Sequence, residues 1–215
     1  EPLFDRETRP RSWALVHHYL GCLLGERLEG AEKDNLEDAI RHYELSLEVR
    51  TPGTGYTEWA MTTNNLGRAY ERRIVGDHAQ NLEKAISLYK SASAAFAGNT
   101  DSRWFAEVQF NLGSAHRKRL VGERADNLRE AIRCHEKALA VSDRAGTPFT
   151  WAKAKASLGA TKVQFGELEN GYYAQAIDDL NDALQVFTLD TAPDDWATVH
   201  FNTASAWLLS EKDQK

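Results

Sequence analysis

Apolar residues recur along this chain at a spacing that is typical of α-helices. In residues 58–75 the positions of one face advance by four, three, four and four: Trp59, Thr63, Leu66, Tyr70 and Ile74. Residues 80–97 repeat this periodicity with Leu82, Ala85, Ile86, Tyr89, Ala92 and Phe96. No segment alternates apolar and polar residues in the manner of a half-buried strand, so the pattern predicts an all-α fold.

The two segments belong to a unit that repeats with a period of 46 residues. An aromatic residue followed by alanine occurs at Trp13-Ala14, Trp59-Ala60, Phe105-Ala106 and Trp151-Ala152, and once more, one residue early, at Trp196-Ala197. A leucine–glycine pair follows at Leu20-Gly21, Leu66-Gly67, Leu112-Gly113 and Leu158-Gly159. The second segment carries Asn35-Leu36, Asn81-Leu82 and Asn127-Leu128, then Ala39-Ile40, Ala85-Ile86, Ala131-Ile132 and, one residue early, Ala176-Ile177. A fixed period of this size predicts a solenoid of stacked helix pairs.

The repeat defines the predicted domain organisation. Residues 1–11 form a lead-in, residues 12–210 a single solenoid domain, and residues 211–215 a polar tail. The repeats span about 12–57, 58–103, 104–149 and 150–194, with a partial fifth repeat at 195–210. We expect helix pairs at about 12–28/34–50, 58–75/80–97, 104–121/126–143 and 150–165/172–188, and a final helix at about 194–210. Because the chain lacks a starting Met and stops early in a fifth repeat, we expect it to be a piece of a longer protein.

Several residues predict how the helices begin, end and touch. Gly67 and Gly113 lie inside predicted helices, where glycine costs roughly 1 kcal/mol relative to alanine, so we expect them where the two helices of a repeat meet. The glycines after the first helices, Gly30, Gly76 and Gly122, are predicted C-caps. The predicted N-caps of the second helices are Asp34-Asn35, Gln80-Asn81 and Asp126-Asn127, and Asp34 with Glu37 has the spacing of a capping box.

The aromatic column is predicted to lie in the core, because it shares a helix face with the leucines of the leucine–glycine pairs. Trp104 directly precedes Phe105, so we expect one of these two to be partly exposed. In the final helix, Phe201, Trp207, Leu208 and Leu209 have no following helix to cover them. Ends of solenoids need a polar cap, so we expect this end to pair with another copy or with a further part of its own chain.

These residues carry a resemblance to a known family. The pattern Leu-Gly-x-x-Tyr on the first helix, followed by Ala-x-x-x-Tyr-x-x-Ala on the second, resembles the tetratricopeptide repeat. The fuller motif from Trp59 to Tyr70, with the long period, resembles a bacterial type found beside caspase-like CHAT protease domains in signalling proteins. The resemblance covers residues 12 to about 209 and implies a right-handed superhelical array of antiparallel helix pairs. Repeat four departs from it, because Tyr172-Tyr173 replaces Asn-Leu.

Composition narrows the functional classes. The net charge is −6 and 42% of the residues are hydrophobic, which disfavours a nucleic-acid or membrane-surface protein. The two cysteines, Cys22 and Cys134, form no disulfide framework, so a reducing cytoplasm is the expected compartment. No apolar run reaches the length of a membrane span.

Candidate catalytic groups are few. His17, His18 and Cys22 share one helix, and Cys134-His135 are adjacent, so a thiolate beside a base is conceivable in both places. His18 and Cys22 also have i, i+4 spacing, but two ligands do not complete a metal site. We interpret Cys134 as a non-core position, Gly53-Thr54-Gly55 as a turn, and Asp178-Asp179 and Asp194-Asp195 as solvated surface. The prediction is therefore no enzyme, no cofactor and no metal.

The resemblance implies that the first helices line a concave groove that binds a protein or peptide. The implied contact residues are His18, Asn64, Asn65, Arg68, Arg72, Asn111, Ser114, Lys118 and Lys153. One column of this face reads Tyr19, Asn65, Asn111, Ser157 and Asn202. Its asparagines can bind a peptide backbone as donor and acceptor, or they can form an internal ladder to the neighbouring repeat.

Charge is unevenly distributed along the chain. Residues 59–75, 104–121 and 151–165 together hold nine basic and two acidic residues, in a chain of net charge −6. A surface with this excess of positive charge favours an acidic ligand. The alternative is that Arg72-Arg73 and Arg117-Lys118-Arg119 offset the partial negative charge at the C-terminal ends of their helices. We therefore predict a non-catalytic interaction scaffold within a larger signalling protein. The alternatives are a self-assembly module that stacks through its ends and, least favoured, RNA binding or enzymatic use of the basic groove.

Overall fold

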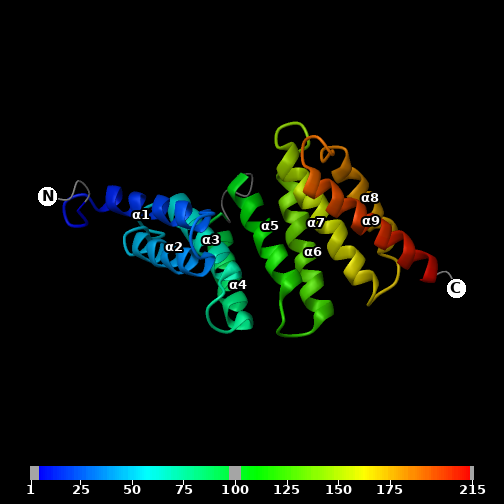
Figure 1. The fold of residues 1–215 in the computed structure, drawn as a ribbon, viewed down its shortest axis with the longest axis horizontal. Helices are drawn as coiled ribbons and strands as arrows, with labels where there is room; N and C mark the ends of the chain where they lie inside the picture. Colours follow the sequence, from blue (N-terminus) through cyan, green and yellow to red (C-terminus); the bar gives the residue numbers. More distant parts are fainter. Residues whose placement is uncertain (1–4, 97–102, 214–215) are drawn as a thin grey trace. The chain divides into compact units, whose positions relative to one another are not determined.

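The computed structural model describes residues 5–96 and 103–213. The chain divides into two compact units, residues 1–100 and 101–215. The first unit contains α1 (Pro10–Gly25), α2 (Glu32–Leu47), α3 (Tyr56–Arg72) and α4 (His78–Ala95). The second contains α5 (Arg103–Lys118), α6 (Arg124–Ala140), α7 (Pro148–Gly166), α8 (Tyr173–Leu184) and α9 (Pro193–Asp213) (Figure 1). The predicted all-α class is confirmed across the described ranges, which contain no strand.

The predicted helices are all present, with shifted ends. In the first three pairs each helix begins one or two residues and ends two or three residues before its predicted boundary. The last helix extends through Asp213, so most of the predicted polar tail is helical; residues 214 and 215 lie outside the described residues, as do residues 1–4 of the lead-in and residue 97. α1 begins at Pro10, whose fixed φ and missing amide hydrogen suit a first helical position.

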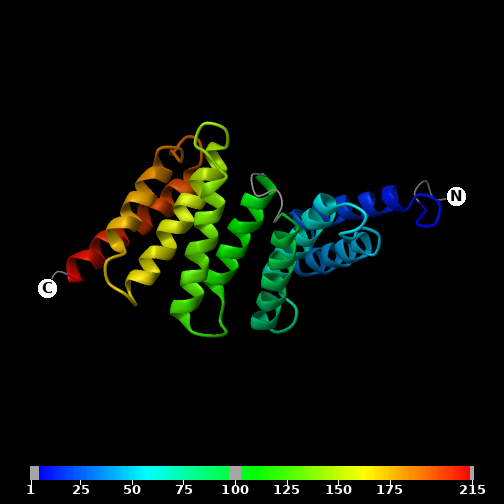
Figure 2. The ribbon, with the colours of Figure 1, turned by 180° about the vertical axis from the view of Figure 1, so that it is seen from behind.

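Within each pair the two helices run antiparallel and pack along their length. In the first pair, Ser46 Oγ donates to the Ala14 carbonyl at 2.8 Å, and Gly21 faces the ring of Tyr43. Figures 1 and 2 show α5, α6 and α7 side by side. In the second unit α5, α7 and α9 are each the first helix of a repeat, and we call them first-position helices. Because α7 contacts both α5 and α9, these three helices form one layer, against which α6 and α8 pack.

Glycine permits the close approach of the paired helices. A Cβ added at Gly67 would lie 2.7 Å from Cε1 of Tyr89, and one added at Gly113 would lie 2.7 Å from Cε1 of His135. Both ring-bearing residues are fully buried. The equivalent contacts in the other pairs are Gly21 with Tyr43 and Gly159 with Leu180. The expectation for Gly67 and Gly113 is therefore confirmed, and the same contact recurs in every pair.

The predicted capping of the second helices is wrong. These helices begin two or more residues earlier, after Ala31, Asp77 and Glu123, and only Asp77 caps with its side chain, accepting from the Gln80 amide at 2.8 Å. Asp34 with Glu37 therefore forms no capping box, because both residues lie inside α2.

The asparagines that recur in the first three repeats lie instead in the first turn of the second helix of each pair. They are buried there and hold the preceding loop. Their amide nitrogens donate to loop carbonyls: Asn35 to Glu29 at 2.9 Å, Asn81 to Val75 at 2.8 Å and Asn127 to Val121 at 2.9 Å.

The glycines predicted as C-caps occupy the same loops. Gly30, Gly76 and Gly122 lie four residues or more beyond the ends of the first helices, and two residues before the second helices begin. Their φ values are 87°, 83° and 83°, in the left-handed region that favours glycine. They therefore turn the chain into the next helix and do not cap the preceding one.

The fourth pair uses a different loop, as the substitution of Tyr172-Tyr173 for Asn-Leu suggested. α7 extends to Gly166, α8 is only 12 residues long, and Gly171 takes the turn with φ 96°. Tyr173 is buried against Gly166, and the ring of Tyr172 meets Phe165 edge to face at 4.7 Å. Aromatic packing thus replaces the asparagine hydrogen bonds.

The aromatic column lies in the core only in part. Phe105 is buried, whereas Trp13, Trp59, Trp151 and Trp196 are half-buried, and Trp151 and Trp196 pack against the core cluster of the second unit. The alanines that follow, Ala14, Ala60, Ala106 and Ala152, are at most 1% exposed. Trp104 is half-buried beside the buried Phe105, as expected.

The apolar face of α9 is largely uncovered, as the sequence predicted. Phe201, Trp207 and Leu208 are 73%, 57% and 65% exposed, and Leu209 is half-buried.

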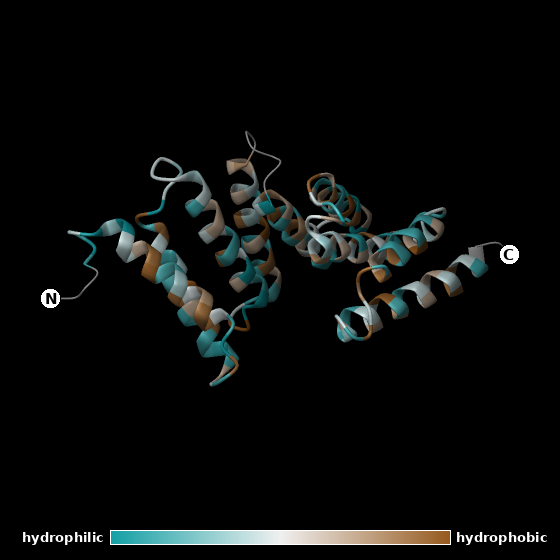
Figure 3. Cartoon of the chain, turned by 90° about the horizontal axis from the view of Figure 1, so that it is seen from above, coloured by the Kyte–Doolittle hydropathy of each residue, from teal (hydrophilic) through white to brown (hydrophobic). Residues whose placement is uncertain are grey.

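Hydrophilic and hydrophobic segments alternate along the helices of each unit (Figure 3). Among the described residues, no helix combines the length and apolar character that crossing a membrane requires.

The glycine contact leads to a direct prediction. Gly67→Leu places a side chain where the buried Tyr89 ring already lies, so we expect it to lower the free energy of unfolding by roughly 1–3 kcal/mol. The matched control is Gly53→Leu in an exposed loop, where an added Cβ meets nothing closer than 3.8 Å. Urea unfolding followed by circular dichroism measures both. Equal stability of the two variants would contradict the packing role of Gly67.

Candidate functional site

The predicted contact residues separate into buried, half-buried and exposed groups. His18 and Asn64 are only 5% and 3% exposed, so their assignment to a groove surface is corrected: both belong to the interior of the first unit. Asn65, Asn111 and Ser114 are half-buried. Arg68, Arg72, Lys118 and Lys153 are exposed.

His18 belongs to a buried polar chain between α1 and α3. Thr62 Oγ1 donates to the Glu58 carbonyl at 2.8 Å and accepts from Arg50 at 2.8 Å. Since Thr62 has a single hydroxyl hydrogen, His18 Nδ1, at 3.0 Å, donates to Thr62 and its Nε2 accepts. Burial and the charge of Arg50 lower the pKa of His18 to about 4, so the imidazole is neutral at physiological pH.

The Cys22 thiol completes this chain. Its sulfur lies 3.7 Å from His18 Nε2, which accepts the S–H, and Asn65 Nδ2 donates to the sulfur at 3.5 Å. A histidine with so low a pKa is a weak base for generating a thiolate. Asn65 therefore bonds the preceding pair, which is the internal-ladder alternative for its column.

The other cysteine–histidine pair is buried. Cys134 is 5% exposed, so its assignment to a non-core position is wrong: it packs on the inner face of α6. His17 faces away from Cys22 and meets His42 on α2, with the two Nδ1 atoms 2.7 Å apart. Within the described residues no group of three or more His, Cys, Asp or Glu side chains could hold a metal ion.

Most basic residues of α3 are already paired within the fold. Arg68 pairs with Glu26 at 3.0 Å, Arg72 with Glu32 at 3.0 Å, and Arg73 with both oxygens of Glu37 at 2.7 Å. Arg72 also donates to the Gly25 carbonyl at the C-terminal end of α1, which is the helix-dipole role weighed against ligand binding. The positive field predicted for this face is therefore largely neutralised by the preceding pair.

Two of the three lysines of α7 are neutralised as well. Asp179 on α8 accepts from Lys155 and from Lys162, both at 2.7 Å, and Lys155 also reaches Asp182 at 2.9 Å. Asp179 is 6% exposed, so its interpretation as solvated surface is wrong. Burial alone lowers the pKa of Lys155, but its bonds to Asp179 and Asp182 outweigh burial and raise it. Lys153 remains exposed and, among the described residues, forms no ion pair.

A cavity of about 510 Å³ opens beside Lys153 in the second unit. It lies between α5, α7 and α9, the layer of first-position helices. Its walls combine aromatic and aliphatic side chains with a few polar groups: Phe110, Arg117, Lys153, Ala156, Ser157, Ala160, Phe187, Asp195, Thr198, Val199, Phe201 and Asn202. Of the contact residues that the resemblance implies, Lys153 lines the cavity together with Ser157 of the polar column, whereas Asn111, Ser114 and Lys118 are not part of the wall.

The wall also contains residues that the sequence did not single out as contacts. Phe201 is 73% exposed, and Asp195 stands at the first turn of α9. Ser157 and Asn202 belong to the polar column, so these two positions of the column face the cavity, whereas Asn111 does not. An apolar hollow with a few convergent polar groups is the usual form of a binding site, and this one can take an apolar side chain flanked by polar backbone.

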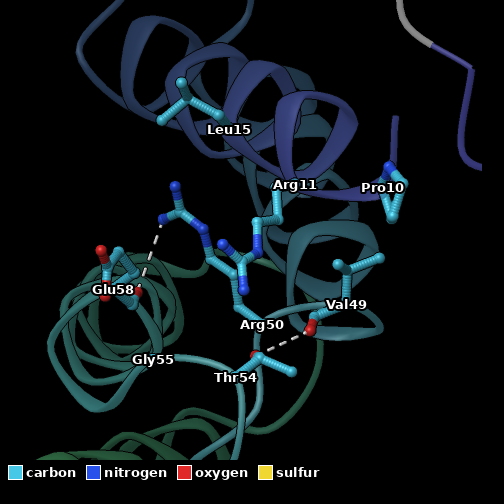
Figure 4. Close-up of a pocket in the computed structure, with 8 residues that line it drawn as sticks. All are labelled: Pro10, Arg11, Leu15, Val49, Arg50, Thr54, Gly55 and Glu58. Carbon is cyan, nitrogen blue, oxygen red and sulfur yellow. Dashed lines mark hydrogen bonds between the residues drawn. The ribbon is translucent and has the colours of Figure 1, made fainter. Parts of the chain in front are cut away.

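A second cavity, of about 350 Å³, lies in the first unit between α1, the α2–α3 loop and the first turn of α3 (Figure 4). Its walls are Pro10, Arg11, Leu15, Val49, Arg50, Thr54, Gly55 and Glu58. Thr54 Oγ1 donates to the Val49 carbonyl at 3.0 Å, which closes the loop that carries Arg50. Figure 4 shows the side chains of Arg11 and Arg50 among the residues that line this cavity.

A scan of protein-family models and a search of curated protein sequences found no match to this chain. The tetratricopeptide resemblance therefore stays a hypothesis based on the residues themselves.

His135 provides a prediction about the second unit. It is fully buried behind Phe110, and among the described residues neither ring nitrogen has a hydrogen-bond partner. Burial and the nearby Arg117 lower its pKa from 6.5 to about 3. Between these two values the unfolded chain binds a proton that the folded chain does not, so stability falls as the pH falls, by about 1.4 kcal/mol per pH unit.

The variant His135→Tyr removes this dependence, since Tyr43 and Tyr89 occupy the same place in the first two pairs. We expect the free energy of unfolding to change less between pH 6.5 and pH 4 in this variant than in the parent. His200→Tyr, at an exposed position of the same unit, is the matched control. Urea unfolding at several pH values measures the slope, and a slope unchanged by His135→Tyr would contradict the assignment.

Proposed function

We propose that this chain is a non-catalytic protein-interaction module of the tetratricopeptide type. In this proposal its helix pairs stack as a right-handed superhelical solenoid, and the first helices line a surface that binds a peptide or a segment of a partner domain. The recurrence of the same glycine contact in four pairs supports a repeat architecture. The observation that carries the function is the cavity between α5, α7 and α9.

The walls of this cavity indicate the chemistry of the bound segment. Phe110 and Phe201 present apolar surface that suits an aromatic or aliphatic anchor side chain, and such buried anchors dominate binding energy at interfaces. Lys153 beside them suits an acidic neighbour of that anchor. Ser157 and Asn202 offer a hydroxyl and an amide to the peptide backbone.

Two other groups of residues support a structural role rather than catalysis. The weakly basic His18 leaves the Cys22 thiol without an effective base. Arg68, Arg72 and Arg73 are engaged in ion pairs with the preceding helix pair, so an acidic residue beside the anchor would meet Lys153 rather than these arginines. We place such a module inside a larger cytoplasmic signalling protein, as the resemblance implies.

The exposed apolar residues of α9 favour a second candidate, self-association. In preceding pairs the position of Leu208 is held by Glu71, which bonds Tyr89, and by Val163, which packs with the α8 core. A second copy that covers this face would make sedimentation of the parent protein concentration-dependent.

The test of the main proposal is peptide selection followed by binding kinetics. We expect a random peptide library displayed on phage to yield sequences with an apolar anchor next to Asp or Glu. Phe201→Ser removes an anchor contact and is expected to raise the dissociation constant of these peptides about tenfold, chiefly through faster dissociation. Lys153→Glu is expected to slow association and to flatten its salt dependence.

Lys137→Glu provides the charge-matched control, because Lys137 is exposed on α6, outside the cavity. Selected peptides that bind both cavity variants as tightly as the parent would contradict the proposal.

A further inference from the structure

The cavity of the first unit contains an unusual pair of charges. Arg11 extends from α1 and Arg50 from the α2–α3 loop, and both line the cavity (Figure 4). Burial lowers the pKa of Arg50, which is partly buried, and this outweighs the negative charge of Glu58, which raises it. An anion in the cavity offsets the cost of burying this charge.

Neither arginine is neutralised by the fold. Among the described residues, Arg11 and Arg50 form no ion pair with a carboxylate. The hydrogen bonds of Arg50 go to neutral oxygens, Thr62 Oγ1 at 2.8 Å and the Glu58 carbonyl at 3.5 Å. By contrast, Arg68 and Arg72 of α3 and the adjoining Arg73 each pair with a glutamate of the preceding pair. Arg11 and Arg50 therefore line the same cavity without a carboxylate partner.

The rest of the cavity wall is suited to an organic anion rather than a bare ion. Leu15 and Val49 provide apolar surface, and Leu15 is 43% exposed. The N-terminal end of the 17-residue helix α3 borders the cavity through Gly55 and Glu58, and its dipole favours negative charge. The carboxylate of Glu58 is the only acidic group of the wall, so the lining keeps a net positive charge.

We propose that this cavity binds a small organic acid, in which a carboxylate is attached to a short hydrocarbon body. Arg11 and Arg50 hold the carboxylate through charge-assisted hydrogen bonds, and the hydrocarbon body lies against Leu15 and Val49. A volume of about 350 Å³ is at the lower end of the range of small-molecule pockets. This site is independent of the peptide-binding proposal, because it uses residues of the first unit alone.

The test uses hexanoate as the probe, with acetate and hexylamine as comparison ligands. Titrations followed by the backbone amide signals of Thr54, Gly55 and Glu58 yield dissociation constants. We expect hexanoate to bind with a millimolar dissociation constant, acetate to bind about tenfold more weakly, and hexylamine not to bind. Equal binding of hexanoate and hexylamine, or no shift of these signals with hexanoate, would overturn the proposal.

Two variants and one control assign the contacts. Arg11→Gln is expected to weaken hexanoate binding about tenfold while leaving the thermal midpoint of the ligand-free protein unchanged, because Arg11 is exposed and forms no ion pair within the described residues. Arg9→Gln removes the same charge two residues earlier, at the N-cap of α1 and outside the cavity wall, and should bind hexanoate like the parent. Leu15→Ser should weaken hexanoate but not acetate. Equal losses with Arg9→Gln and Arg11→Gln would show general charge attraction and refute the site.

Discussion

The contact between a glycine on one helix and a ring or leucine on its partner sets the spacing within every helix pair. Because the glycine has no side chain, the ring of Tyr43, Tyr89 or His135 lies directly against the backbone of the opposite helix. Ala14, Ala60 and Ala152, seven residues before the glycine of their own helix, are completely buried as well. Helices this close leave no room for a larger residue, so the position of each pair is determined by where its glycine falls in the sequence.

This constraint also decides which surface is left for binding. Loops held by Asn35, Asn81 and Asn127 fix the ends of the pairs, and arginines of α3 join one pair to the next through ion pairs. Side chains used in this way are unavailable to a ligand. Two cavities beside the first helices of the repeats remain for ligands. One lies next to Lys153 in the second unit, and the other, in the first unit, is lined by two arginines that form no ion pair.

The sequence predicted the helix pairs and the glycine contacts because both follow from periodicity, which a repeat displays several times over. It misplaced the caps, since Asn35 can cap a helix or donate to a loop carbonyl and the residue type alone does not distinguish these roles. It assigned Asp179 to the surface because burial of a carboxylate depends on Lys155 and Lys162, which lie on another helix. It also missed Phe201 and the Arg11–Arg50 pair as cavity residues, because each cavity joins segments that are distant along the chain.

The central claim is that glycine is required by the ring that faces it, and a double-mutant cycle tests this most directly. Gly67→Ala, Tyr89→Val and the double variant are compared by urea unfolding. With Tyr89 present, the added methyl group meets ring atoms at 2.7–3.2 Å; with valine it meets none of them, and only the higher helix propensity of alanine remains, up to about 1 kcal/mol. The account predicts that Gly67→Ala destabilises the parent, stabilises the Tyr89→Val variant, and shows a coupling energy of about 1 kcal/mol or more. Additive effects of the two substitutions would contradict it.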